Sequence, residues 1–142
     1  MSKRQISGIL KKYSVIAVVG LSADSEKDSY RVSAYLQEQG YRIIPVNPFI
    51  DEVLGEKSYP SLLEIPAEIQ KTIEIVDVFR QSKDVLPIVE QAVKLKQQFG
   101  RPFVVWMQLG IVNEQAAEKA RCAGLVVVMD KCLMVEHLSV TV

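Results

Sequence analysis

The chain has 142 residues, of which 49% are hydrophobic and 24% are charged, and its formal net charge is zero. This composition predicts one globular domain over residues 1–142, and the absence of net charge argues against nucleic acid or an anionic membrane surface as the main partner. Because the chain has two cysteines, no membrane-length apolar run and no signal peptide, we expect a cytoplasmic protein that needs no disulfide framework and no metal site.

The first predicted elements are a helix, a strand and a second helix. Apolar residues at helical spacing between residues 6 and 13 predict a short N-terminal helix. Residues 15–19, Val-Ile-Ala-Val-Val, are typical of a strand that is buried on both faces. Gly20 follows where the chain must turn sharply, and after a loop rich in Ser and Asp the helical spacing resumes up to Gly40.

The rest of the chain continues this alternation. Further strands are expected where short apolar runs occur, at residues 41–46, 73–79, 103–107 and 125–129. Further helices are expected between Ser82 or Asp84 and Gly100, from Asn113 to Ala123 and from Cys132 to His137. Residues 49–72 contain Gly and Pro and are expected to be irregular apart from one helical turn at 61–64.

Alternating strands and helices indicate an α/β fold. Right-handed crossovers would then give a doubly wound, Rossmann-like parallel sheet of five strands between two helical layers, with strand order 3-2-1-4-5. Ligands of such sheets bind outside the carboxyl ends of the strands. The strand ends are therefore the segments in which we look for a site.

The loop after the first strand has features of a phosphate site. The N–H groups at the start of the next helix favour an anion, Ser22 offers a hydroxyl, and Arg31 can fork around a phosphate. An arginine near a helix start opposes the helix dipole, and a phosphate would explain its presence. The alternative is a turn that binds nothing, because this loop has one glycine where a dinucleotide site has three.

The end of the second strand argues against a nicotinamide or flavin dinucleotide. An Asp or Glu would be needed there to hold the ribose hydroxyls, but the chain has Asn47. NAD(P) binding therefore stays the alternative, and the prediction is that the protein is not a dehydrogenase.

Seven short motifs occur in one order along residues 14–137. They are Gly-Leu-Ser (20–22), Arg-x-Ser (31–33), Pro-Val-Asn-Pro (45–48), Leu-Gly-Glu-Lys-x-Tyr-Pro-Ser-Leu (54–62), Asp-Val-Phe-Arg (77–80), Trp-x-Gln-x-Gly (106–110) and Met-Asp-Lys-Cys-Leu-Met-Val-Glu-His (129–137). Together they resemble the small stand-alone CoA-binding Rossmann proteins, which are similar to the CoA-binding N-terminal domain of the succinyl-CoA synthetase α-subunit.

This resemblance implies CoA or an acyl-CoA as the ligand. The Gly20–Ala23 loop would cradle the phosphates beside Arg31, the segment after the second strand would flank the adenosine, and the ends of the third and fourth strands would form the opposite wall. The residues that would bind CoA are Gly20, Leu21, Ser22, Ala23, Arg31, Asn47, Pro48, Phe79, Arg80, Gln108, Gly110 and Cys132.

One position departs from the resemblance. Relatives often carry a basic residue directly after Asn-Pro, suited to the ribose 3′-phosphate, whereas this chain has Phe49. Either another cation such as Arg42 or Lys57 takes that role, or the preference for CoA over dephospho-CoA is weaker.

Several of these residues also have a purely structural interpretation. Phe79 and Trp106 suit the core as strand-end aromatics, and Gln108 could satisfy backbone groups of its turn. Arg80 could pair with an aspartate, either Asp77 or Asp84.

The sequence favours binding without catalysis. His137 is the only histidine, and it is expected to be a surface or capping residue without a nucleophile beside it. Cys132 could form a mixed disulfide with the CoA thiol if the pantetheine arm runs along its edge of the sheet, or it could be a small buried residue. The predicted function is thus a non-catalytic CoA-binding, carrier or regulatory module, with a cryptic enzyme acting on acyl-CoA as an alternative and any protein partner or homo-oligomer unidentified.

Overall fold

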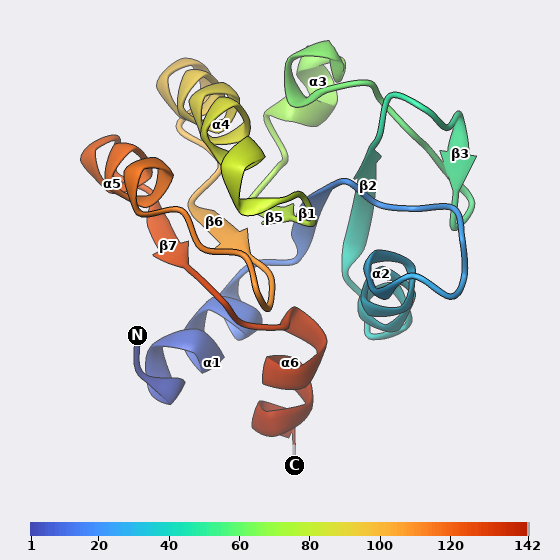
Figure 1. Ribbon diagram of the computed structural model, residues 1–142, viewed down its shortest axis with the longest axis horizontal. Coiled ribbons are helices and arrows are strands. Elements are labelled where there is room, and N and C mark those ends of the chain that lie inside the picture. Colours follow the sequence, from blue (N-terminus) through green and yellow to red (C-terminus); the bar gives the residue numbers. More distant parts are fainter. Residues whose placement is uncertain (142) are drawn as a thin grey trace.

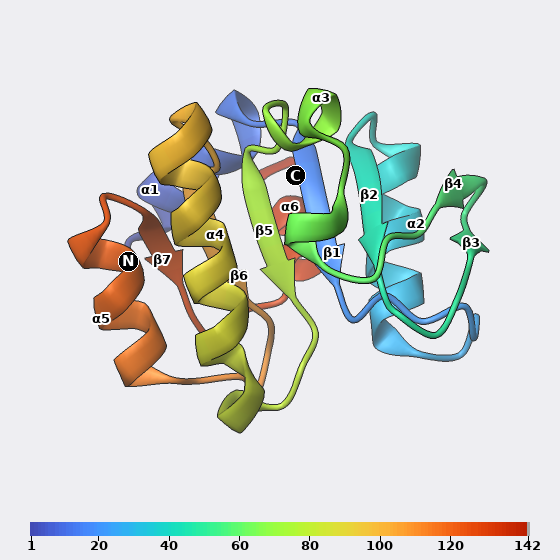
Figure 2. The ribbon, with the colours of Figure 1, turned by 90° about the horizontal axis from the view of Figure 1, so that it is seen from above.

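A parallel sheet of five strands forms the centre of the protein. The computed structural model describes residues 1–141 and pairs the strands in the order β2-β1-β5-β6-β7, as Figure 2 shows from one side of the molecule. Their bounds are β1 Val15–Val19, β2 Arg42–Val46, β5 Ile75–Val78, β6 Val104–Met107 and β7 Val126–Val128. The predicted α/β class and the five parallel strands are confirmed, with ends that differ by one or two residues.

The predicted strand order is wrong. β5, the third of these strands along the chain, pairs with β1 and β6, so the order in chain numbering is 2-1-3-4-5 and β2 is the edge strand. Pro45 in β2 gives the physical reason. Its carbonyl faces outward and accepts from the N–H of Tyr59 at 3.1 Å, and a proline at that position has no N–H with which to bind a further strand. The edge position removes this conflict.

Helices cover both faces of the sheet, as Figure 1 shows. One face is covered by α1 (Lys3–Lys12), α2 (Asp28–Glu38) and α6 (Leu133–Thr141), and the other by α3 (Ala67–Gln70), α4 (Val85–Phe99) and α5 (Glu114–Cys122). Each face has its own cluster of buried apolar side chains. This confirms the predicted three-layer arrangement. Within residues 1–141 no helix has the length and hydropathy needed to cross a membrane.

The segment expected to be irregular is more ordered than the sequence suggests. It contains a small antiparallel hairpin of β3 (Glu52–Val53) and β4 (Glu56–Lys57), a 3-10 turn at Leu62–Glu64 and the short helix α3. Tyr59 bridges to Val46 and so covers the open edge of β2. The segment therefore closes the sheet on the side where the sequence had placed another strand.

Two of the predicted helix caps have different outcomes. Asn113 caps α5 as predicted, since its Oδ1 accepts from the N–H of Ala116 at 2.9 Å. Neither Ser82 nor Asp84 caps α4 with its side chain, because both belong to a 3-10 turn (Ser82–Asp84) that leads into the helix. The Ser82 hydroxyl instead accepts from the N–H of Val112 at 3.0 Å. This contact ties the loop after β5 to the loop after β6.

Candidate functional site

Gly20 ends β1 and makes the sharp turn that the sequence predicts. Its φ is +91°, and its N–H donates to the carbonyl of Val46 at 2.8 Å. A Cβ atom on Gly20 would lie 2.3 Å from the carbonyl oxygen of Phe79, far inside van der Waals contact. The close packing of the ends of β1 and β5 therefore requires glycine here before any ligand is considered.

The loop between Gly20 and α2 is held by hydrogen bonds within itself. The N–H of Ser22 donates to the Oγ of Ser29 at 2.9 Å, and the Oγ of Ser22 accepts from the N–H of Asp24 at 3.0 Å. Leu21 is fully buried in the apolar cluster beneath α1, α2 and α6, whereas Ala23 is exposed. Leu21 is thus part of the core, and neither its side chain nor its backbone is exposed to a ligand in this structure.

Asn47 joins the loops that follow β1 and β2. Its Nδ2 donates to the carbonyl of Leu21 at 3.0 Å, and its Oδ1 accepts from the N–H of Phe49 at 2.9 Å. Both ends of the amide are thus engaged within the protein. Asn47 fixes the relative position of the two loops, with Pro48 and the 85% exposed ring of Phe49 beside it.

Two arginines near this edge of the sheet differ in whether they form an ion pair with a carboxylate. Arg31 forms an ion pair with Asp28, and its Nη1 donates to the carbonyl of Glu26 at 3.1 Å. The structure therefore provides a reason for an arginine near the helix start that requires no phosphate. Arg80 is exposed and, among residues 1–141, has no carboxylate within ion-pairing distance. The alternative in which it pairs with Asp77 or Asp84 is wrong.

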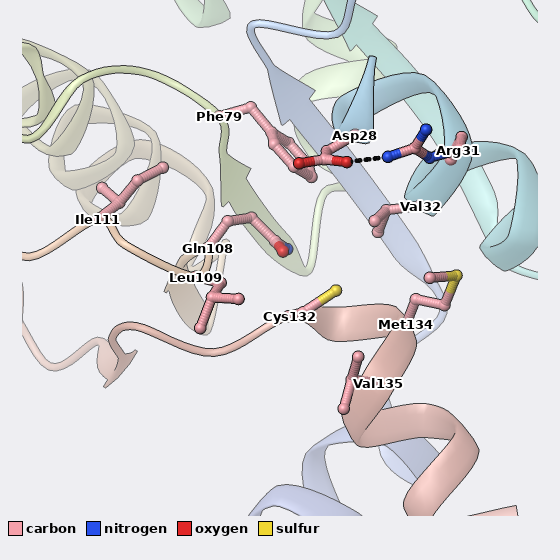
Figure 3. A pocket seen from close by; sticks show the side chains of 10 residues that line it. All are labelled: Asp28, Arg31, Val32, Phe79, Gln108, Leu109, Ile111, Cys132, Met134 and Val135. Carbon is pink, nitrogen blue, oxygen red and sulfur yellow. Dashed lines mark hydrogen bonds and ion pairs between the residues drawn. The ribbon is translucent and has the colours of Figure 1, made fainter. Parts of the chain in front are cut away.

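Two of the cavities at the carboxyl ends of the strands lie on either side of the segment Phe79–Arg80, which contributes one residue to each. The first, called here the α2–α6 cavity, has a volume of about 240 Å³ and is drawn in Figure 3. Four residues of the predicted site line it, namely Arg31, Phe79, Gln108 and Cys132. Its other lining residues are Asp28, Val32, Leu109, Ile111, Met134 and Val135.

The second cavity, called here the β2–α4 cavity, has a volume of about 250 Å³. Three predicted residues line it, Gly20, Pro48 and Arg80. Apolar side chains of Pro60 and Ile88 stand on its wall. Seven of the twelve predicted residues thus line two cavities that share the Phe79–Arg80 segment as a partition, whereas Leu21, Ser22, Ala23, Asn47 and Gly110 line neither.

The cations suggested as substitutes for a base after Asn-Pro lie elsewhere. Arg42 begins β2 and so lies at the opposite end of that strand from Asn47. Arg42 and Lys57 line a separate cavity along the outer edge of β2. Neither lines the two cavities at the strand ends, so the hypothesis that one of them contacts a ligand there has no support from their positions.

Gln108 links the sheet to α6. Its Nε2 donates to the Oδ1 of Asp77 at 2.6 Å, and its Oε1 accepts from the N–H of Leu133 at 3.4 Å. Asp77 is fully buried, and its Oδ2 has no hydrogen-bond partner. Burial raises the pKa of Asp77 from 3.8 to about 8, and the hydrogen bond from Gln108 opposes part of this rise. With this pKa the protonated form of Asp77 predominates at pH 7.

The structure also places Trp106, Gly110 and His137, and it corrects the role predicted for His137. Trp106 is fully buried, and its Nε1 donates to the carbonyl of Lys131 at 2.7 Å, as the structural interpretation expects. The N–H of Gly110 donates to the Oδ1 of Asp130 at 2.6 Å and fixes the loop after β6. His137 is not a surface residue, because it is 8% exposed and its Nδ1 bonds the hydroxyl of Tyr35 at 2.7 Å. This bond helps to fasten α6 to α2.

The sequence did not single out several residues that build the site. Asp77 entered the sequence analysis as part of a motif and as a candidate partner of Arg80, although an acid inside an apolar strand is itself a signal of a buried polar group. Met134 and Val135 line the α2–α6 cavity because α6 begins directly after the loop that follows β7. Within residues 1–141 no group of three His, Cys, Asp or Glu side chains is arranged to hold a metal ion.

Comparison with known proteins identifies a family and two close relatives of the chain. Residues 14–138 match the family described as the CoA binding domain. The chain is 42% identical to the protein YneT of Bacillus subtilis (strain 168) over 136 residues, which is 96% of this chain and 94% of YneT. A solved structure of a hypothetical protein from Pyrococcus horikoshii OT3 superposes with a TM-score of 0.90 at 42% identity, over 100% of this chain and 94% of that one.

A similarity of shorter extent involves a larger enzyme. The α subunit of the ADP-forming acetate–CoA ligase II of Pyrococcus furiosus is 45% identical to the chain over 62 residues. That match covers 43% of this chain and 14% of the ligase subunit. The similarity is thus to a small part of that subunit.

Proposed function

This chain belongs to the CoA binding domain family, and we propose that it binds CoA at the carboxyl ends of β1, β2, β5 and β6 as a carrier or regulatory module without transforming it. The similarity to the acetate–CoA ligase subunit supports CoA as the ligand class.

Arg80 is the observation that carries the proposal. It is an exposed guanidinium without an ion-pair partner among the described residues, and its Cδ lies 3.0 Å from the position a Cβ on Gly20 would take. CoA carries its phosphates on the 3′-phospho-ADP portion. Because the chain has no net charge, the attraction for these phosphates must come from local cations. An unpaired arginine beside the glycine turn supplies one.

The β2–α4 cavity suits the rest of the nucleotide. Pro48, Pro60 and Ile88 offer apolar surface for the adenine ring next to the Arg80 guanidinium. Asn47 contributes by fixing the loop that carries Pro48, rather than by binding the ligand itself. In this arrangement the pantetheine arm crosses the Phe79–Arg80 partition toward the α2–α6 cavity.

Arg31 contributes less than Arg80 to the proposed binding of the CoA phosphates. It can reach a phosphate only in competition with Asp28 and the carbonyl of Glu26, which hold it in the free protein. A charge-assisted contact contributes on the order of 1.5–3 kcal/mol, so Arg80→Ala is expected to weaken CoA binding roughly 10- to 100-fold. Arg31→Ala is expected to weaken it towards the lower end of that range.

Titration of CoA into the protein by calorimetry tests the proposal. The wild type should bind, Arg80→Ala should bind more weakly, and Arg121→Ala, an exposed arginine of α5, should match the wild type. A wild type that binds no CoA would overturn the function, and wild-type affinity in Arg80→Ala would remove Arg80 from the site. Protein-dependent release of free thiol from an acyl-CoA would show that the module is instead an enzyme.

A further inference from the structure

The lining of the α2–α6 cavity differs from that of the β2–α4 cavity in being mainly apolar. Its walls come from α2, the segment after β5, the loop after β6 and the start of α6, and Figure 3 shows their side chains surrounding one space. The apolar members are Val32, Phe79, Leu109, Ile111, Met134 and Val135. At about 240 Å³ the cavity is smaller than the roughly 300–1,000 Å³ of sites that hold a whole drug-sized ligand, so it suits one end of a longer molecule.

We infer that this cavity holds the acyl group of a CoA thioester, and that the acyl group is a short, uncharged aliphatic chain. The inference rests on the proposed binding of CoA and names the form of CoA that binds best. Free CoA ends in a thiol on a polar arm, which gains little from an apolar cavity. An aliphatic chain would cover apolar surface that now faces water, including Leu109, which is 70% exposed, and Val135, which is 53% exposed.

Gln108 gives the cavity one polar contact suited to a thioester. Figure 3 shows its amide pointing toward the space between the walls. One N–H of Nε2 donates to Asp77, and the Oε1 accepts from Leu133, so the amide orientation is fixed from behind. An amide nitrogen carries a second N–H, and that donor remains for a carbonyl oxygen in the cavity. A thioester carbonyl is an acceptor of this kind.

The charged residues at the cavity favour a neutral acyl group over one that ends in a carboxylate. Asp28 and Arg31 are the charged residues on its lining, and they are paired with each other. A terminal carboxylate on the acyl chain would therefore lie among apolar side chains without a free cation. Contact with these apolar side chains would replace part of the hydration of the carboxylate, and Arg31 could pair with it only by leaving Asp28. The geometry thus selects a neutral chain over a dicarboxylic one of the same length.

Calorimetric titration with CoA, acetyl-CoA, butyryl-CoA and succinyl-CoA tests this inference. Butyryl-CoA has two methylene groups more than acetyl-CoA, which predicts roughly tenfold tighter binding. Succinyl-CoA has the same chain length as butyryl-CoA but a terminal carboxylate, and it should bind at least about tenfold more weakly than butyryl-CoA. Equal affinities for CoA, acetyl-CoA and butyryl-CoA, or succinyl-CoA binding as tightly as butyryl-CoA, would overturn the inference.

Variants that fill the cavity connect the selectivity to these walls. Val135→Trp and Leu109→Trp each place a large ring at the cavity from an exposed position, and each should reduce the ratio of butyryl-CoA to CoA affinity to about one. Val126→Trp is the matched control on β7, 40% exposed and away from both cavities, and it should keep the wild-type ratio. An unchanged ratio in both cavity variants would refute the location. If the wild type bound neither CoA nor a thioester, the proposed function itself would fail, and this result is distinct from the others.

Discussion

Substitution of Asp77 by Asn is expected to change how the stability of the protein depends on pH. Asp77 lies in β5 between β1 and β6, is fully buried and accepts one hydrogen bond, from Gln108. Its other carboxylate oxygen has no partner. Asn preserves the acceptor for Gln108 but has no proton to lose.

The direction and size of the effect follow from the raised pKa. Burial shifts the pKa of Asp77 from 3.8 to about 8, so above pH 4 the unfolded chain loses a proton that the folded protein keeps. The free energy of unfolding therefore falls as pH rises between about 4 and 8, by about 1.4 kcal/mol per pH unit. Between pH 5 and pH 7 the contribution of Asp77 falls by roughly 3 kcal/mol, which is large for a protein of this size.

Urea denaturation at pH 5, 6 and 7 measures this contribution. The wild-type unfolding free energy should decline relative to that of Asp77→Asn by roughly 3 kcal/mol over this range. Asn also leaves a donor without a partner, but that cost is the same at each pH and does not affect the slope. Asp51→Asn, at an exposed position, should follow the wild type. Parallel curves for wild type and Asp77→Asn would refute the assignment of a buried, neutral Asp77.

Three further predictions concern the strand ends. Gly20→Ala should destabilise the protein well beyond Gly40→Ala, because a Cβ on Gly20 would meet the carbonyl of Phe79 whereas a Cβ on Gly40 would meet nothing. For Gly40→Ala a loss of roughly 1–2 kcal/mol is expected from the left-handed backbone alone, and equal losses for the two variants in urea denaturation would contradict this. Asp28→Asn should tighten CoA binding roughly 2- to 5-fold by freeing Arg31, and unchanged or weaker binding by calorimetry would exclude Arg31 from phosphate contact. In the Cys122→Ser variant, CoA disulfide should exchange with the Cys132 thiol, forming a protein–CoA disulfide and releasing one CoA thiol, and the intact mass of the protein should show this adduct. Absence of the adduct, or its persistence in the Cys122→Ser/Cys132→Ser double variant, would contradict a contact between Cys132 and the CoA thiol.

The strand order shows what local patterns leave undetermined. Both 3-2-1-4-5 and 2-1-3-4-5 satisfy right-handed crossovers and parallel pairing, so the alternation of elements could not choose between them. Pro45 indicates that β2 is the edge strand, because a proline inside a strand favours the edge of a sheet. The four fully buried residues of β5 agree with its central place. The order could thus have been derived from one residue rather than from the overall pattern.

The features of the candidate site differ in how far the sequence could specify them. Gly20 was predictable as a turn, since an apolar run ends there and a helix follows. Its contact with Phe79 was not, because that contact joins positions 59 residues apart. The ion pair between Asp28 and Arg31 was in reach, as their spacing of three residues places them on one face of a helix. The division of the site into two cavities depends on side-chain packing and has no local signature.

Competition among nucleotide ligands tests the central claim most directly. Native mass spectrometry of the protein, incubated with equal concentrations of CoA, NAD and NADP, reports which ligand stays bound. Binding at the strand ends through Arg80 predicts a single CoA adduct that weakens in Arg80→Ala, and it predicts no dinucleotide adduct. A dinucleotide adduct in place of CoA, or no adduct with any of the three, would contradict the account.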